Sequence, residues 1–174
     1  MKDEIINRVA NSKLVTLDLE DYYPKGARVS FDISPWLLEG IVLKESDFRE
    51  KAKTYDWSKH QDQYVALYCS TDAIIPGWAY MFLSLQLAPY SKKVVVGDLE
   101  ELEKVLFTEL LVQFDVSTFI GQPVIIKGCT KLPIPDNAFV LLAQRLQEVA
   151  KSIMYGEACS SVPLYKNRGV SSMK

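Results

Sequence analysis

The sequence predicts an α/β fold: a three-layer domain with a parallel βαβαβα core and an N-terminal antiparallel β extension. From residue 64 onward, short strand-like runs alternate with helical patterns, as expected for parallel strands joined by right-handed crossovers. Residues 94–96, Val-Val-Val, form an uninterrupted apolar run, which is typical of a strand in a sheet covered on both faces. Ahead of this region, two alternating runs flank a turn signal, which predicts the antiparallel extension.

The first 60 residues contain this predicted hairpin and two helix starts. Residues 14–19 and 28–33 alternate between apolar and polar side chains in the manner of strands, and the turn signal Tyr-Pro-Lys-Gly occupies residues 23–26 between them. Pro35 is suited to open a short helix, because its missing N–H is not needed there. Ser46 is the expected N-cap of the charged surface helix that follows it.

Three strands and three helices are expected to form the parallel core. The strands are predicted at residues 65–68, 94–96 and 124–126, each a short run rich in β-branched or aromatic residues. Pro76 is expected to occupy the first position of the helix after the first of these strands. Each strand is thus followed by a helix, which is the arrangement that makes neighbouring strands parallel.

The other two core helices have start signals of their own. Asp98 is the expected cap of the helix after the second strand, because Glu101 follows three residues later as in a capping box. Pro135 and Asp136 begin a long helix whose apolar residues keep helical spacing as far as Ile153. A helix of about 20 residues spans about 30 Å, so the segment after it would return from the opposite end of the sheet.

Length and composition favour one soluble domain. Residues 1–174 are expected to form it, with an N-terminal section over residues 1–60 and a core section with a C-terminal tail over residues 61–174. The net charge of −2 argues against nucleic-acid binding. We see no signal peptide and no apolar stretch long enough to span a membrane. Three cysteines, an odd number, favour reduced thiols in a cytoplasmic protein.

The three cysteines are the most informative residues for function. Cys69 follows the first core strand, Cys129 follows the third, and Cys159 lies in a polar segment after the last helical pattern. Ligands bind outside the carboxyl ends of parallel strands. If the first core strand lies between the other two, Cys69 and Cys129 are therefore neighbours. Asp98, which follows the second strand, would border the same crevice.

Three thiolates and one further ligand suit a tetrahedral zinc ion or an iron–sulfur cluster. Asp98, Glu157 and His60 are the candidates for the further ligand. His60 is the only histidine, but it precedes the first core strand and is expected at the opposite edge of the sheet. The predicted metal site therefore contains Cys69, Cys129, Cys159, Asp98 and Glu157.

Two other interpretations stay open. Cysteine is among the most buried residue types, so all three can be packing residues of an interaction module without chemistry. The nine tyrosines favour a homodimer in that case, because aromatic residues are enriched at interfaces. Alternatively, one thiol activated by a helix N-terminus would be the nucleophile of a thiol-dependent enzyme. That enzyme would lack a nearby histidine base, given the expected position of His60.

Several segments carry a family resemblance, which extends over nearly the whole chain. They are residues 7–12, 14–24, 68–80, 127–129 and 152–163. These segments resemble the family known as domain of unknown function 2480. The resemblance implies a bacterial protein, chiefly from Bacteroidetes, in a family with no assigned activity and no established catalytic residues. It also implies genes for iron–sulfur cluster assembly as neighbours, so it favours iron–sulfur assembly proteins as partners and an iron–sulfur role for the cysteine site.

Overall fold

The computed structural model describes residues 14–128, 130–157 and 160–167. The chain divides into two compact units. Unit 1 contains the described residues up to Tyr23 and those from Phe107 onward, whereas unit 2 is the continuous segment Pro24–Leu106. The single-domain organisation expected from length stays a prediction.

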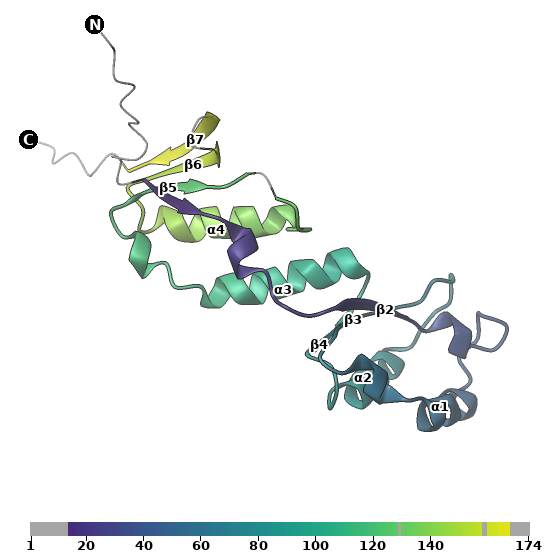
Figure 1. Ribbon diagram of the computed structural model, residues 1–174. Helices are drawn as coiled ribbons and strands as arrows, with labels where there is room; N and C mark the ends of the chain where they lie inside the picture. Colours follow the sequence, from purple (N-terminus) through teal and green to yellow (C-terminus); the bar gives the residue numbers. More distant parts are fainter. Residues whose placement is uncertain (1–13, 129, 158–159, 168–174) are drawn as a thin grey trace, which may run out of the picture. The chain divides into compact units, whose positions relative to one another are not determined.

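Unit 2 contains a three-stranded parallel sheet, sheet B, in the order β2-β3-β4. Its strands are β2 (Arg28–Asp32), β3 (Tyr64–Tyr68) and β4 (Lys93–Val96). Its helices are α1 (Glu45–Thr54), α2 (Gly77–Leu87) and the first half of α3 (Leu99–Gln113), with short 3₁₀ helices at Ser34–Trp36 and Trp57–His60. Figure 1 shows α1 and α2 on the same side of the three strands.

Alternation along the strands of sheet B separates two apolar layers. Val65 and Leu67 of β3 pack with residues of α1 and α2 in one cluster, Phe48 and Leu83 among them. Ala66, the residue between them in β3, points to the other face and packs with residues of α3. Unit 2 therefore has the three layers that the sequence predicts, because residues on both faces of β3 are apolar.

A shielded ion pair fixes α3 on sheet B. Arg28 Nε lies 2.6 Å from Glu103 Oε1, and both side chains are largely buried, at 13% and 7% exposed. Arg28 also donates to the carbonyl oxygens of Pro24 and Gly26, at 2.5 and 2.7 Å. Its guanidinium lies 5.0 Å from the centre of the Tyr64 ring. These contacts join the start of β2 to the second turn of α3.

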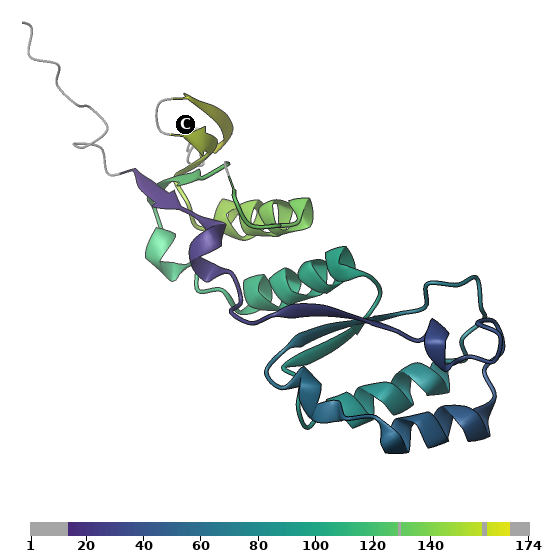
Figure 2. The same ribbon diagram turned by 45° about the vertical axis from the view of Figure 1, so that its right-hand side comes forward.

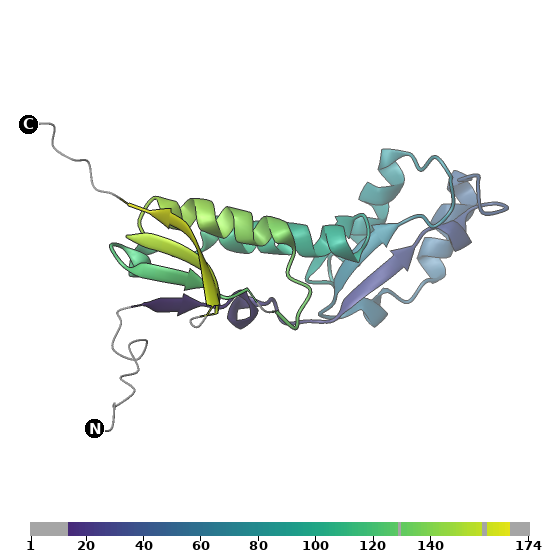
Figure 3. The ribbon, with the colours of Figure 1, turned by 90° about the horizontal axis from the view of Figure 1, so that it is seen from above.

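Unit 1 contains a four-stranded sheet, sheet A, in the order β1-β5-β6-β7. Its strands are β1 (Val15–Leu17), β5 (Pro123–Ile126), β6 (Ser152–Glu157) and β7 (Ser160–Lys166). The first three are parallel, and β7 is antiparallel to β6 (Figure 3). Its helices are α4 (Asp136–Gln147), the second half of α3, and 3₁₀ helices at Leu19–Tyr22 and Ser117–Phe119.

The core of unit 1 lies between sheet A and its two α-helices. Val124 and Ile126 of β5 and Ile153 of β6 share one buried cluster with Phe107 of α3 and Leu142 of α4. Both helices thus pack on the same face of the sheet. Among the described residues, no helix combines the length and the apolar character that crossing a bilayer requires.

The predicted α/β class is confirmed, but the N-terminal antiparallel hairpin is wrong. Residues 14–19 and 28–33 do contain strands, β1 and β2, but these belong to different sheets. β1 pairs in parallel with β5, and β2 pairs in parallel with β3. The alternating pattern gives the positions of strands correctly, but it contains no information about which distant strand completes the hydrogen bonding.

The single run of core strands is also wrong, since β3 and β4 belong to sheet B whereas β5 belongs to sheet A. The long C-terminal helix ends at Gln147, not near Ile153. Residues 152–157 instead form β6, in which Ile153 faces the core. Ala150 is buried between the two elements, so the apolar spacing continues across the end of the helix. The cap at Asp98 is confirmed, whereas Lys44, not Ser46, is the N-cap of α1.

Candidate functional site

The carboxyl ends of β2 and β3 are joined by a polar cluster around Asp32. The Asp32 Oδ1 atom accepts from the amide nitrogens of Ser34 and Ser70, at 2.9 and 3.0 Å. Its Oδ2 atom accepts from the two serine hydroxyls, at 2.8 and 2.6 Å. Partial burial alone would raise the pKa of Asp32, but these four hydrogen bonds outweigh it and lower the pKa from 3.8 to about 2. Asp32 is therefore ionised at neutral pH.

A cavity of about 400 Å³ opens at the same edge of sheet B. It is lined by Ser30, Tyr68, Asp98, Leu99 and Glu100. Asp98 accepts a hydrogen bond from the Glu101 amide at 2.8 Å, so the N-terminus of α3 is already capped by a carboxylate. Two carboxylates on the wall of the cavity disfavour an anionic occupant, although a free helix N-terminus would attract one.

Cys69 follows β3 on the opposite face of sheet B, where it packs against the apolar cluster formed with α1 and α2. Its Sγ lies 3.3 Å from the Thr71 hydroxyl oxygen, and that hydroxyl lies 2.6 Å from the Gly40 carbonyl oxygen. The Thr71 hydroxyl has one hydrogen, which it donates to Gly40 because a carbonyl can only accept. The Cys69 thiol is then the donor to Thr71.

The carboxyl edge of sheet A carries a second polar cluster. Asp18 follows β1 and Lys127 follows β5, and their side chains form an ion pair with a distance of 2.5 Å between Nζ and Oδ2. The Glu20 carboxylate accepts from the amides of Lys131 and Leu132. Burial alone would raise the pKa of Asp18, but the hydrogen bond from Lys127 and that from the Glu20 amide lower it. The pKa of Lys127 is raised, chiefly by its hydrogen bond to Asp18.

Glu157 lies at this same edge of sheet A. It ends β6, the parallel neighbour of β5, and it is one of the carboxylates whose charge raises the pKa of Lys127. The Tyr155 hydroxyl donates to the Gly128 carbonyl at 3.4 Å, which links β6 to the residue just before Cys129. Glu157 is also paired with Ser160 in the β6–β7 ladder. Only Ala158 and Cys159 separate these two paired residues in the chain.

The structure places the described members of the predicted site in both units. Cys69 and Asp98 belong to unit 2, and Glu157 belongs to unit 1. Cys129 and Cys159 lie outside the described residues. Within the described part of the chain, no group of three or more His, Cys, Asp and Glu side chains is arranged to hold a metal ion. The expectation that the Cys69 strand lies beside the Cys129 strand is wrong, because β3 lies between β2 and β4.

His60 lies ahead of β3, away from the carboxyl edge of sheet B. It is 8% exposed, with Nε2 at 2.9 Å from the Tyr55 hydroxyl and Nδ1 at 3.2 Å from Gln63 Oε1. Because Gln63 Oε1 can only accept, Nδ1 is the donor of that hydrogen bond. The histidine is a satisfied packing residue in an aromatic cluster with Phe31.

The sequence reasoning missed the polar residues that follow the strands. Asp32 and Ser34 have the spacing of an Asx turn directly after a strand, and this signal was available. Asp18 and Lys127 each follow a strand by one residue, but only the parallel pairing of β1 with β5 brings them together. Nothing local in the sequence specifies that pairing, since more than 100 residues separate the two strands.

The fold and these clusters define an α/β protein whose polar side chains gather at the carboxyl ends of parallel strands, where α/β proteins bind their ligands. Residues 3–167 match the sequence profile of the family described as "Protein of unknown function (DUF2480)". The chain belongs to this family, as the resemblance of its sequence segments implied. No curated protein and no solved structure matches the chain.

Proposed function

We propose that the protein binds a metal ion or an iron–sulfur cluster through Cys129 and Cys159 at the carboxyl edge of sheet A, with Glu157 as a further ligand. In this proposal it is an accessory protein of a reducing cytoplasm, which holds or transfers metal for iron–sulfur assembly proteins. The supporting observation is that the described neighbours of both cysteines meet at one edge of one sheet. β5 leads to Gly128 and β6 leads to Glu157, and the two strands are parallel neighbours.

Both cysteines are direct chain neighbours of described residues at this edge. Cys129 is bonded to Gly128 and Cys159 to Ser160, and consecutive Cα atoms are about 3.8 Å apart. Gly128 contacts the Tyr155 side chain, and Ser160 is paired with Glu157. The described chain neighbours of the two cysteines therefore lie in the segment after β5 and at the start of β7.

The donor set suits a soft or borderline metal. Two thiolates and one carboxylate supply three ligands, which leaves a coordination position for a partner protein or water. An open position and ligands from short connecting segments are what a metal carrier needs for release.

Cys69 and Asp98 are the other two members of the metal site predicted from the sequence. We do not include them among the ligands proposed at sheet A, because both belong to unit 2 and the Cys69 thiol donates a hydrogen bond to Thr71.

The test is the metal and sulfide content of the full chain purified anaerobically without a metal-affinity tag. We expect near-stoichiometric zinc or iron, the latter with acid-labile sulfide and a visible absorption band. Cys129→Ser and Cys159→Ser are expected to lose the metal, and Cys69→Ser is the matched control that retains it. A folded wild-type chain that contains no metal and takes up neither zinc nor iron with sulfide contradicts the proposal.

A further inference from the structure

Helix α2 exposes a continuous stripe of uncharged residues on the side away from sheet B. The stripe contains Gly77, Met81, Leu85 and Ala88, spaced by three or four residues as on one face of a helix. Met81 is 62% exposed and Leu85 is 70% exposed. A Cβ atom added to Gly77 would meet no neighbour within 4 Å, so the start of the stripe borders open space.

The opposite face of α2 is already used for packing. Ala79, Leu83 and Leu87 are fully buried against sheet B. No Asp, Glu, Lys or Arg occurs between Asp72 and Lys92, although such residues make up 24% of the chain. A helix that is apolar around its whole circumference is typical of one that is buried on more than one side.

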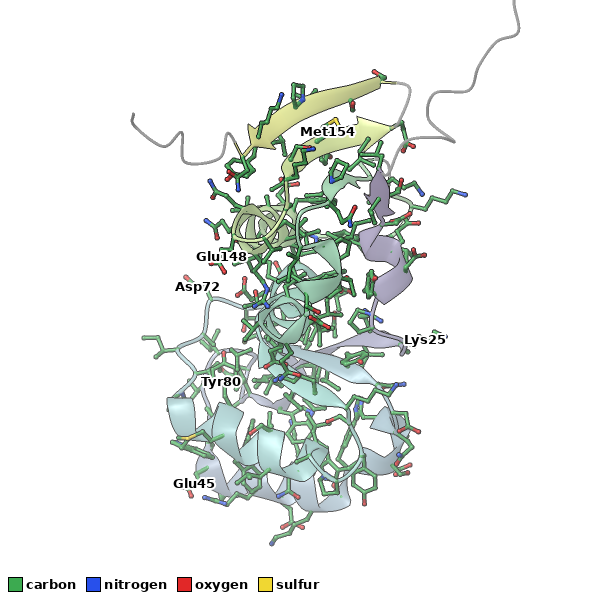
Figure 4. All side chains as sticks on the ribbon, turned by 90° about the vertical axis from the view of Figure 1, so that its left-hand side faces the viewer. Lys25, Glu45, Asp72, Tyr80, Glu148 and Met154 are labelled. Atoms are coloured by element: carbon green, nitrogen blue, oxygen red, sulfur yellow. The ribbon has the colours of Figure 1, made fainter. Side chains whose placement is uncertain are left out.

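Helix α1 lies beside α2 and supplies a charged flank to the stripe (Figure 2). Phe48 of α1 packs against the Trp78 and Phe82 rings, at 5.8 and 6.3 Å between ring centres. The Arg49 guanidinium lies over the same two rings, at 5.4 and 4.9 Å. It also forms an ion pair with Glu45 at 2.8 Å. Figure 4 shows the side chains of this helical layer, with Glu45 and Tyr80 labelled.

The net charge of α1 changes sign along its length. Its first turn contains Glu45 and Asp47 and its last turn contains Lys51 and Lys53, with Arg49 and Glu50 between them. Arg49 pairs with Glu45, and Lys53 pairs with Glu50, within the helix. Each helix connects the carboxyl end of one parallel strand to the amino end of the next, so α1 and α2 run in the same direction. The outer layer of unit 2 thus combines a neutral helix with a helix that is acidic at one end and basic at the other.

We propose that this layer is a homodimer interface, in which a second copy of the chain binds across a twofold axis with the two α2 helices antiparallel. A twofold contact joins a surface to itself, so the surface must be complementary to itself. An uncharged stripe meets this condition without like-charge repulsion. An axis that makes the α2 helices antiparallel also makes the α1 helices antiparallel, and this places the acidic end of each α1 opposite the basic end of its copy.

The proposed axis passes between Met81 and Leu85 of the stripe. Met81 of one protomer then packs against Leu85 of its partner, and the reverse contact follows by symmetry. Gly77 and Ala88 lie at the two ends of the stripe, where small residues let the two helices approach closely. This geometry predicts which paired substitutions preserve the dimer and which dissociate it.

The test is the mass of the full chain in solution, measured by sedimentation or light scattering across a concentration series. We expect twice the 19.7 kDa mass of one chain. Met81→Glu with Leu85→Glu places carboxylates opposite one another and is expected to weaken dimerisation roughly a hundredfold or more. Both positions are exposed, so the far-ultraviolet circular dichroism spectrum is expected to stay that of the wild type. Val140→Glu, at an exposed valine of α4, is the control that keeps the dimer.

A second variant tests the direction of the helices. Met81→Glu with Leu85→Lys puts Glu opposite Lys of the partner only if the α2 helices are antiparallel, and this pair is expected to dimerise. Failure of this variant to dimerise overturns the antiparallel arrangement. A monomeric wild-type chain at several hundred micromolar, or a dimer that survives the double glutamate substitution, overturns the interface.

Discussion

Ser70 donates two hydrogen bonds to Asp32, from its amide nitrogen at 3.0 Å and from its hydroxyl at 2.6 Å. The two residues are 38 positions apart, and each lies at the carboxyl end of its strand region. The carboxylate also accepts two hydrogen bonds from Ser34. At the carboxyl edge of sheet B, Asp32 therefore links the end of β2 to the segment that follows β3.

Removal of the Asp32 charge is expected to destabilise unit 2. Asp32→Ala leaves the amides of Ser34 and Ser70 without an acceptor and is expected to lower the free energy of unfolding by about 1–3 kcal/mol. Urea unfolding followed by tryptophan fluorescence measures this change. Asp72→Asn, in the exposed segment after Ser70, is the control with an unchanged midpoint. Equal stability of wild type and Asp32→Ala contradicts the structural role of the cluster.

Asp32 also gives the protein a specific dependence on pH. Its pKa is about 2 in the folded chain and 3.8 without these contacts, so the unfolded chain binds the proton more tightly. The stabilisation is thus complete above about pH 4 and is lost as the pH falls from about 4 to 2. The difference in thermal midpoint between wild type and Asp32→Asn should shrink over this interval. A difference that stays constant down to pH 2 argues against a lowered pKa.

The Arg28–Glu103 pair is expected to be important for the stability of unit 2. Glu103→Ala leaves the shielded Arg28 guanidinium without its carboxylate and is expected to cost about 3–5 kcal/mol, as for other buried pairs broken on one side. Chemical denaturation measures the loss. Lys53→Ala removes one partner of an exposed pair with Glu50 and should leave the midpoint unchanged. Similar midpoints for the two variants would show that the buried pair is dispensable.

Gly156 of β6 is expected to tolerate no side chain. Its φ is +120°, and an added Cβ would lie 2.6 Å from the Ser160 carbonyl oxygen. Gly156→Ala therefore combines backbone strain with a clash against backbone, and we expect a loss of at least about 2 kcal/mol. A Cβ atom added at Gly128 would have its nearest neighbour 3.0 Å away, in the Tyr155 ring, which can shift. Gly128→Ala should cost less in the same thermal unfolding experiment, and the reverse order would contradict the β6–β7 geometry.

Local patterns predicted where the strands lie, but not which strands pair. β2, β3, β4 and β5 all occur at predicted positions, because alternating or apolar runs bounded by turn residues are local signals of strands. The pairing of β1 with β5 depends on chain segments more than 100 residues apart. Ile153 has the spacing of a helical residue relative to Val149, yet it lies in β6. The spacing of apolar residues alone could not distinguish a longer helix from a helix followed by a strand.

The candidate site was predictable to the same limited extent. Position after a strand identified Asp98 as a helix cap and Cys69 as a residue at a strand end. The Asp18–Lys127 and Asp32–Ser70 contacts each join residues distant in the sequence, so they required the sheet topology. The same topology separates the strand before Cys69 from the strand before Cys129.

The most direct test of the proposed function is the metal content of Cys129→Ser measured beside that of Cys69→Ser, both purified anaerobically and both confirmed as folded. A metal site at the carboxyl edge of sheet A predicts near-stoichiometric metal in Cys69→Ser and none in Cys129→Ser. Equal metal content in the two variants, or none in the wild type after reconstitution, would contradict it.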